Sequence, residues 1–112
     1  MNSHADIEAG VCGFRTQATA ASDDGQLVTF SVDTDCDKIG QLAAALADRQ
    51  PLDAFQEISP AGEGVFMATV RETLTGCCSG CAVPAGIFKA MQVAAGLALP
   101  KDISICLSKS ED

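Results

Sequence analysis

The sequence contains no tryptophan and no tyrosine, so its five phenylalanines are its only large aromatic side chains. A protein that binds single-stranded nucleic acid usually offers stacking aromatics, which are scarce here. Basic residues are also few: seven stand against fifteen acidic ones, which gives a formal net charge of −8. Because phosphate binding requires clustered basic side chains, this balance argues against nucleic acid and against an anionic membrane surface as partners.

Histidine is nearly absent as well. His4 is the single one, and it lies in an N-terminal segment that we expect to be solvated. A Ser-His-Asp or Cys-His catalytic arrangement is therefore not expected. We interpret the chain as a protein without enzymatic activity, with thiol redox chemistry as the one activity left open.

Long apolar runs are missing too. No stretch approaches the roughly 18 consecutive apolar residues that typify a membrane span. The first ten residues are polar and acidic, without the basic start and apolar centre of a secretion signal. The expectation is a protein that does not contact a membrane and is located in the cytoplasm.

The sequence is rich in cysteine, with six residues: Cys12, Cys36, Cys77, Cys78, Cys81 and Cys106. In a reducing compartment a cysteine-rich chain is more often metal-binding or redox-active than cross-linked by disulfides. A single free cysteine is usually a small buried hydrophobic residue. All except Cys106 can be brought to one place, which favours a shared role over simple packing. Cys106 is expected to be structural or at the surface.

Two segments alternate apolar and polar residues with period 2, residues 11–21 and residues 27–35. This pattern predicts two strands. A three-residue loop, Asp23-Asp24-Gly25, would join them, with Gly25 in the left-handed conformation. The predicted register places Phe30 opposite Ala18 and, one step beyond the apolar pairs, Cys12 opposite Cys36.

Helical periodicity marks two main segments. The first runs from an N-cap at Asp35 to a stop at Pro51, and the second runs from Pro84 to Gly96. Residues 52–58 are expected to be a short helix, residues 65–74 a helix or a strand with helix preferred, and residues 103–108 a third strand. The predicted fold is α+β: a small sheet made of the β-hairpin and the C-terminal strand, with two main helices on one face. One domain over residues 10–108 would have flexible ends at residues 1–9 and 109–112.

The cysteine spacing predicts a metal site. Cys78-x-x-Cys81 lets two thiolates chelate one metal in a glycine-containing loop. Cys12 and Cys36 form the second pair, and Cys77 is a spare or substitute ligand. Cys36 and Cys81 both lie near predicted helix N-termini, where the partial positive charge is expected to lower a thiol pKa. Because only one pair is local in sequence, an iron–sulfur cluster or a labile zinc site is favoured over a closed zinc knuckle.

Four stretches together resemble a small uncharacterised prokaryotic cysteine-rich family: V-C-G-F (11–14), D-T-D-C (33–36), C-S-G-C-A-V-P (78–84) and A-G-L-A-L-P-K-D-I (95–103). Members of that family carry C-G-F, a later D-C and C-x-V-P before a helix and a closing strand. The resemblance covers nearly the whole chain and implies no particular chemistry.

The chain more distantly resembles the NifU/IscU-type iron–sulfur scaffold proteins. Those proteins also place a Cys-Gly before a hairpin strand, a second cysteine at the start of the following helix and a third at the start of a later helix. The resemblance implies a cluster site at Cys12, Cys36 and Cys81. Scaffolds have an acidic residue where this chain has Phe14 and a histidine where it has Gly80, so Cys77 or Cys78 would supply the fourth ligand.

The predicted function is therefore cysteine-ligated binding of a metal or an iron–sulfur cluster. The protein would act as a scaffold, a carrier or an electron-transfer module, with an iron–sulfur or redox protein as its partner. The alternative is a thiol/disulfide redox protein that uses Cys78 and Cys81.

Overall fold

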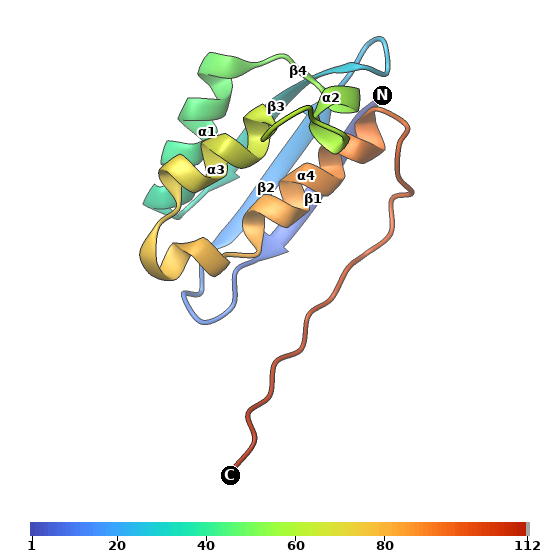
Figure 1. The fold of residues 1–112 in the computed structure, drawn as a ribbon. Helices are drawn as coiled ribbons and strands as arrows, with labels where there is room; N and C mark the ends of the chain where they lie inside the picture. Colours follow the sequence, from blue (N-terminus) through green and yellow to red (C-terminus); the bar gives the residue numbers. More distant parts are fainter. Residues whose placement is uncertain (112) are drawn as a thin grey trace.

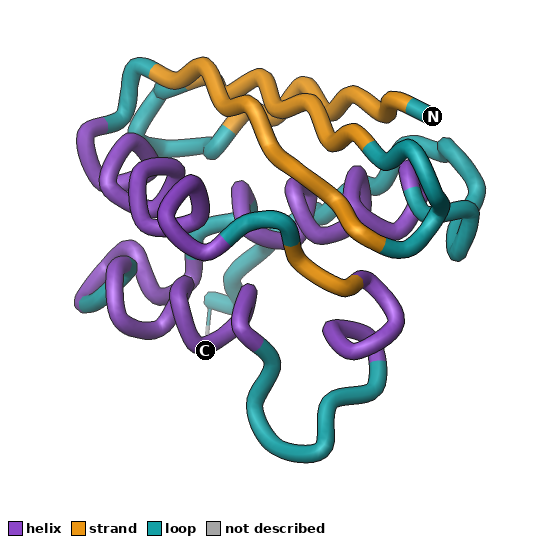
Figure 2. Tube along the Cα trace, turned by 90° about the horizontal axis from the view of Figure 1, so that it is seen from above, coloured by secondary structure: helices purple, strands orange, loops and turns teal. Residues whose placement is uncertain are grey.

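The computed structural model describes residues 1–111 and has an α+β fold, as predicted (Figure 1). Four strands form one antiparallel sheet in the order β1-β2-β3-β4: β1 Asn2–Glu8, β2 Arg15–Ala21, β3 Leu27–Thr34 and β4 Leu52–Asp53. The helices are α1 Asp37–Arg49, α2 Ala54–Ile58, α3 Val65–Thr73 and α4 Val83–Ala94, with a 3-10 helix, η1, at Gly76–Gly80. Figure 2 shows the helices gathered on one face of the sheet, also as predicted.

The third long strand comes from the N-terminus and not from the C-terminus. Residues 1–9, predicted to be a flexible end, contain β1, which pairs with β2 over its whole length. Ser3, Ala5 and Ile7 alternate inward, but only Ile7 is large, so the apolar signal of this strand is weak in the sequence. The predicted strand at residues 103–108 is not formed, because none of the described residues after Ala94 belongs to a helix or strand. Residues 109–111 are exposed, and residue 112 lies outside the described part.

The register of the hairpin between β2 and β3 differs from the predicted one by two residues. Phe30 pairs with Ala20, and Val32 pairs with Ala18. A shift of two keeps every side chain on its predicted face, since side chains alternate with period 2. It removes the direct cross-strand pairing of Cys12 with Cys36 that the sequence predicted.

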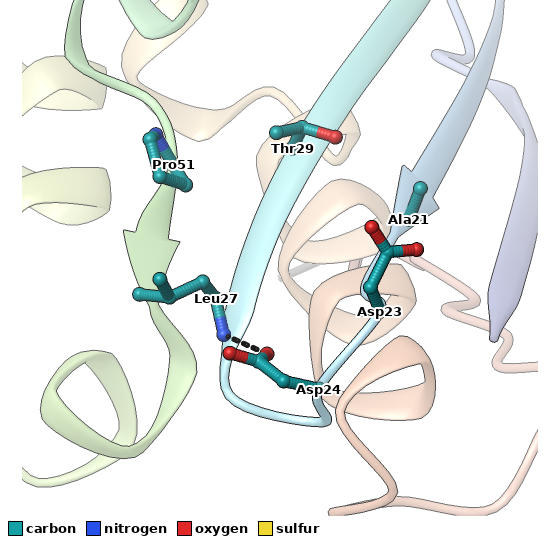
Figure 3. A pocket seen from close by; sticks show the side chains of 6 residues that line it. All are labelled: Ala21, Asp23, Asp24, Leu27, Thr29 and Pro51. Atoms are coloured by element: carbon teal, nitrogen blue, oxygen red, sulfur yellow. Dashed lines mark hydrogen bonds between the residues drawn. The ribbon is translucent and has the colours of Figure 1, made fainter.

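Hydrogen bonds inside a longer loop account for the shift. One carboxylate oxygen of Asp24 accepts from the backbone N–H of Leu27 at 2.9 Å (Figure 3) and from that of Gln26, also at 2.9 Å. The Ser22 hydroxyl accepts from Gly25 N–H at 3.0 Å. Gly25 has the predicted positive φ, +75°. These donors, first Leu27 and then Gln26, hold the pKa of Asp24 below its usual value. The side chains of Ser22 and Asp24 thus hold a loop that is longer than the predicted three-residue turn.

Helix α1 confirms the predicted periodicity and ends before Pro51, as expected. Its buried residues are Ile39, Leu42 and Leu46. The N-cap position is taken by Cys36 and not by Asp35, and the Cys36 carbonyl accepts from Gly40 N–H at 2.9 Å. The Cys36 thiol makes no capping hydrogen bond to the helix.

Phe66 on α3 lies at the centre of the core, fully buried. The centroid of its ring is 5.3 Å from the ring centroid of Phe88 on α4, in an edge-to-face arrangement, and 6.1 Å from the ring centroid of Phe30 on β3. Ala18 of β2 and Ile87 of α4 belong to the same buried cluster. The cluster around Phe66 therefore holds β2, β3, α3 and α4 together, although these elements are distant in sequence.

One stretch, Gly76–Ala94, is long and apolar enough to cross a membrane by length and composition. It comprises η1 and α4, whose helices are separated at Cys81 and Ala82. In this structure α4 lies against the sheet, with Val83, Ile87 and Met91 buried. The core therefore contains the buried part of the stretch, which is 39% of the apolar window.

Glu57 is a buried carboxylate that caps a helix it does not belong to. Its two oxygens accept from the backbone N–H groups of Val65 at 3.0 Å and Phe66 at 2.5 Å, the first turn of α3. These donors have no partner within their helix, so a carboxylate here satisfies them and complements the helix dipole.

We expect Glu57→Ala to lower the free energy of unfolding by about 1–3 kcal/mol, because two buried N–H groups lose their acceptor. Urea denaturation followed by circular dichroism measures this change. Glu63→Gln is the matched control, since Glu63 is exposed and pairs with Arg71 at the surface. Equal destabilisation by the two variants would contradict the capping role.

Candidate metal centre

Four cysteines come from segments that meet at one end of the sheet. The loop between β1 and β2, the junction of β3 and α1, helix η1 and the start of α4 all lie at the lower left of Figure 1. Cys12, Cys36, Cys78 and Cys81 belong to these segments, and Cys77 lies beside Cys78 in η1. The chain reaches this end after β1, again after β3 and a third time after α3.

Cys12 lies in the loop between β1 and β2 and is exposed. The sequence predicted a strand here, but β2 begins only at Arg15. Gly10 and Gly13 both have positive φ, +92° and +74°, and Gly13 N–H donates to the Gly10 carbonyl at 2.9 Å. This glycine turn leaves the Cys12 side chain at the rim of the site.

Cys36 is half-buried against the main core cluster, at the point where β3 ends and α1 begins. Its backbone N–H donates to the Thr34 hydroxyl at 3.2 Å, and that hydroxyl is 2.8 Å from the Thr16 hydroxyl on β2. Sequence reasoning did not single out either threonine. A threonine two residues before a helix start is the signal that could have indicated this turn.

The 3-10 helix η1 sets the spacing of the Cys78-x-x-Cys81 pair. Cys78 N–H donates to the Thr75 carbonyl at 3.3 Å, and Cys81 N–H donates to the Cys78 carbonyl at 3.2 Å. Cys78 and Cys81 are half-buried and pack against the same cluster as Cys36. Cys77, by contrast, is exposed.

The pKa of the Cys81 thiol is affected by its burial and by the other cysteines. Burial raises the pKa of the Cys81 thiol, and the charges of Cys12, Cys36 and Cys78 raise it further. The Val83 N–H, at the start of α4, acts in the opposite direction by bonding the sulfur. The sequence predicted a lowered pKa for Cys81, and this was wrong because burial outweighs the helix N-terminus.

Proximity does not yet amount to a coordination geometry. Across residues 1–111, no three histidine, cysteine or acidic side chains are arranged as a set that could hold a metal ion. All six cysteines are free thiols.

The acidic residues close to Cys36, together with His4 and Cys106, are at the surface. Asp33, Asp35 and Asp37 are exposed. His4, expected in a solvated end, lies on β1 with its Nδ1 3.0 Å from the Thr19 hydroxyl. Cys106 is exposed in the C-terminal segment, in agreement with a surface position.

Residues 3–107 match the protein family described as "family of unknown function (DUF6951)". The chain belongs to this family. The match contains all six cysteines and agrees with the resemblance to a small cysteine-rich family. No curated protein and no solved structure matched the chain, so the comparisons lend no support to a relationship with NifU/IscU-type scaffolds.

Proposed function

We propose that this protein binds a metal ion or an iron–sulfur cluster through Cys12, Cys36, Cys78 and Cys81. The observation that carries the proposal is the position of Cys81, which lies close enough to the other three thiols for their charges to raise its pKa. Four thiolates are the ligand set of structural zinc sites and of common iron–sulfur clusters.

The surroundings suit such a set. Cys36, Cys78 and Cys81 are half-buried on the core, so their backbone positions are held by packing. Cys12 is on an exposed loop and could close over a bound ion from the solvent side. The negative thiolates would repel one another in the free protein. A bound cation would compensate their charge, and its binding would draw the sulfurs together.

The distribution of ligands favours a centre that exchanges its metal or cluster. The four cysteines come from three segments of the chain, with Cys12 and Cys36 far from the local Cys78–Cys81 pair, unlike the compact knuckles of closed zinc sites. The exposed Cys77 beside Cys78 supplies a spare thiol for ligand exchange. We therefore propose a scaffold, carrier or electron-transfer role, with an iron–sulfur or redox protein as the partner. The placement of Cys12, Cys36 and Cys81 relative to the hairpin and the two helices supports a scaffold-like arrangement.

A thiol/disulfide reaction of Cys78 with Cys81 is the alternative function. An attacking thiol in such proteins has a lowered pKa, which makes the thiolate available near neutral pH. Burial raises the pKa of Cys81, so Cys81 is poorly suited to attack.

Anaerobic purification followed by metal analysis and a visible spectrum tests the proposal. We expect zinc near one equivalent per chain, or iron with acid-labile sulfide and absorption near 400 nm, roughly as cysteine-ligated clusters show. A protein that contains neither iron nor zinc at a near-stoichiometric level would overturn the proposal. A reversible Cys78–Cys81 disulfide with a defined potential, formed by a metal-free protein, would favour the alternative.

A further inference from the structure

The edge of the sheet at β1 is incompletely covered. β1 is the first strand in the sheet order of the described residues, and its partner is β2 on one side. Ala18 and Ala20 of β2 are buried, whereas Ala5 and Ile7 of β1 remain half-buried although they face the same helix layer. An exposed edge of seven residues is a ready template for another strand.

Helix α4 lies beneath this edge. A Cβ atom added to Gly86 would lie 2.5 Å from Cδ1 of Ile7, so the helix and the strand approach closely. The next strand beyond β1 would therefore face the outer flank of α4. A strand with one apolar face would fit there.

The C-terminal segment has such a face. Ile103, Ile105 and Leu107 are 55%, 68% and 92% exposed. They alternate with Ser104 and Cys106, the period of a half-buried strand. The family match extends to residue 107 and so includes this segment.

The segment is directed away from its own domain. Figure 1 shows it leaving the end of α4 near the start of β1 and extending well beyond the helices. Ten residue steps from Leu97 to Leu107 can span about 33 Å when extended. The whole structure measures 50 × 29 × 27 Å, so the segment can reach across the width of a neighbouring molecule.

We propose that the β1 edge accepts Ile103–Leu107 from a second copy of this chain as an added strand. Backbone hydrogen bonds would supply affinity, and the apolar face would set the register over the α4 flank. Ser104 and Cys106 would then lie on the solvent face with His4 and Asp6. Reciprocal exchange gives a closed two-fold dimer, in which each copy contributes one segment and one edge. The proposal stands independently of the metal centre.

Light scattering on a sizing column, in the presence of a reductant, tests the stoichiometry. At about 100 μM we expect the full chain to be a dimer, and a chain ending at Leu97 and the Ile105→Asp variant to be monomers. Ser104→Asp is the matched control: it places the same charge on the opposite face and should stay dimeric. A monomeric full chain, or an Ile105→Asp variant that remains fully dimeric, overturns the proposal.

Hydrogen exchange on the same proteins locates the contact. We expect the β1 amides to exchange at least tenfold faster in the truncated chain, while β3 amides change little. If the full chain is a monomer and truncation still speeds β1 exchange, the segment covers the β1 edge of its own molecule. If the full chain is a dimer and truncation leaves β1 exchange unchanged, the segment docks elsewhere. Either result overturns the proposed exchange between copies.

Discussion

Cys81→Ser is expected to reduce the bound metal from near one equivalent, or one cluster, per chain to background. Cys81 is the thiol whose pKa responds to the other three cysteines, so its removal takes a ligand from the centre of the set. A serine hydroxyl does not ionise near neutral pH and is a poor substitute for thiolate. Metal analysis and the visible spectrum of anaerobically purified protein measure the loss.

Cys106→Ser provides the matched control, because Cys106 is exposed in the C-terminal segment and should not affect metal content. Cys77→Ser should leave most of the metal bound and change its rate of exchange with a chelator. The ligand assignment is contradicted if Cys81→Ser retains full metal while remaining folded by circular dichroism. A loss of metal that is equal in Cys81→Ser and Cys106→Ser would point to non-specific thiol binding.

Phe66→Ala should be the most destabilising single substitution in the core, lowering the free energy of unfolding by about 3–5 kcal/mol. The ring is fully buried and contacts Phe30 and Phe88, so its loss leaves a cavity between α3, β3 and α4. Small domains are stable by only about 5–15 kcal/mol, and a loss of this size unfolds a large fraction of a marginal one. Urea denaturation of the metal-free, reduced protein measures the change.

The corresponding control is Phe55→Ala, since Phe55 on α2 is 47% exposed and should cost far less. Because Cys36, Cys78 and Cys81 pack against the same cluster as Phe66, we expect the core variant also to hold metal less tightly. A destabilisation by Phe66→Ala below about 1 kcal/mol would show that the core collapses around the missing ring and does not depend on it.

Local patterns predicted most of the helical structure. The apolar spacing of Ile39, Leu42 and Leu46 placed α1, and Pro51 placed its end. The alternation in β2 and β3 predicted the correct faces, because side-chain direction in a strand depends only on parity. These features rest on short-range geometry, which neighbouring residues determine.

Features that depend on distant contacts were predicted less well. The hairpin register was off by two residues, because the side chains of Ser22 and Asp24 hold a longer loop than the turn pattern suggested. Segment 1–9 is a strand because β2 supplies its hydrogen bonds, and its own alternation of Ser3, Ala5 and Ile7 is too weak to indicate this. At residues 103–108 the pattern is strong, yet no strand forms within the described residues of the chain. Strand formation requires a partner as well as a propensity.

For the candidate site, the sequence by itself determined the chemistry: six thiols, a local Cys-x-x-Cys pair and scarcely any histidine. Only the tertiary structure decided which thiols are neighbours. It set the segments that carry Cys12, Cys36, Cys78 and Cys81 toward one end of the sheet, despite the wrong register. It also reversed the expected pKa shift of Cys81, because burial depends on what the rest of the chain packs around a side chain, and no local spacing records that.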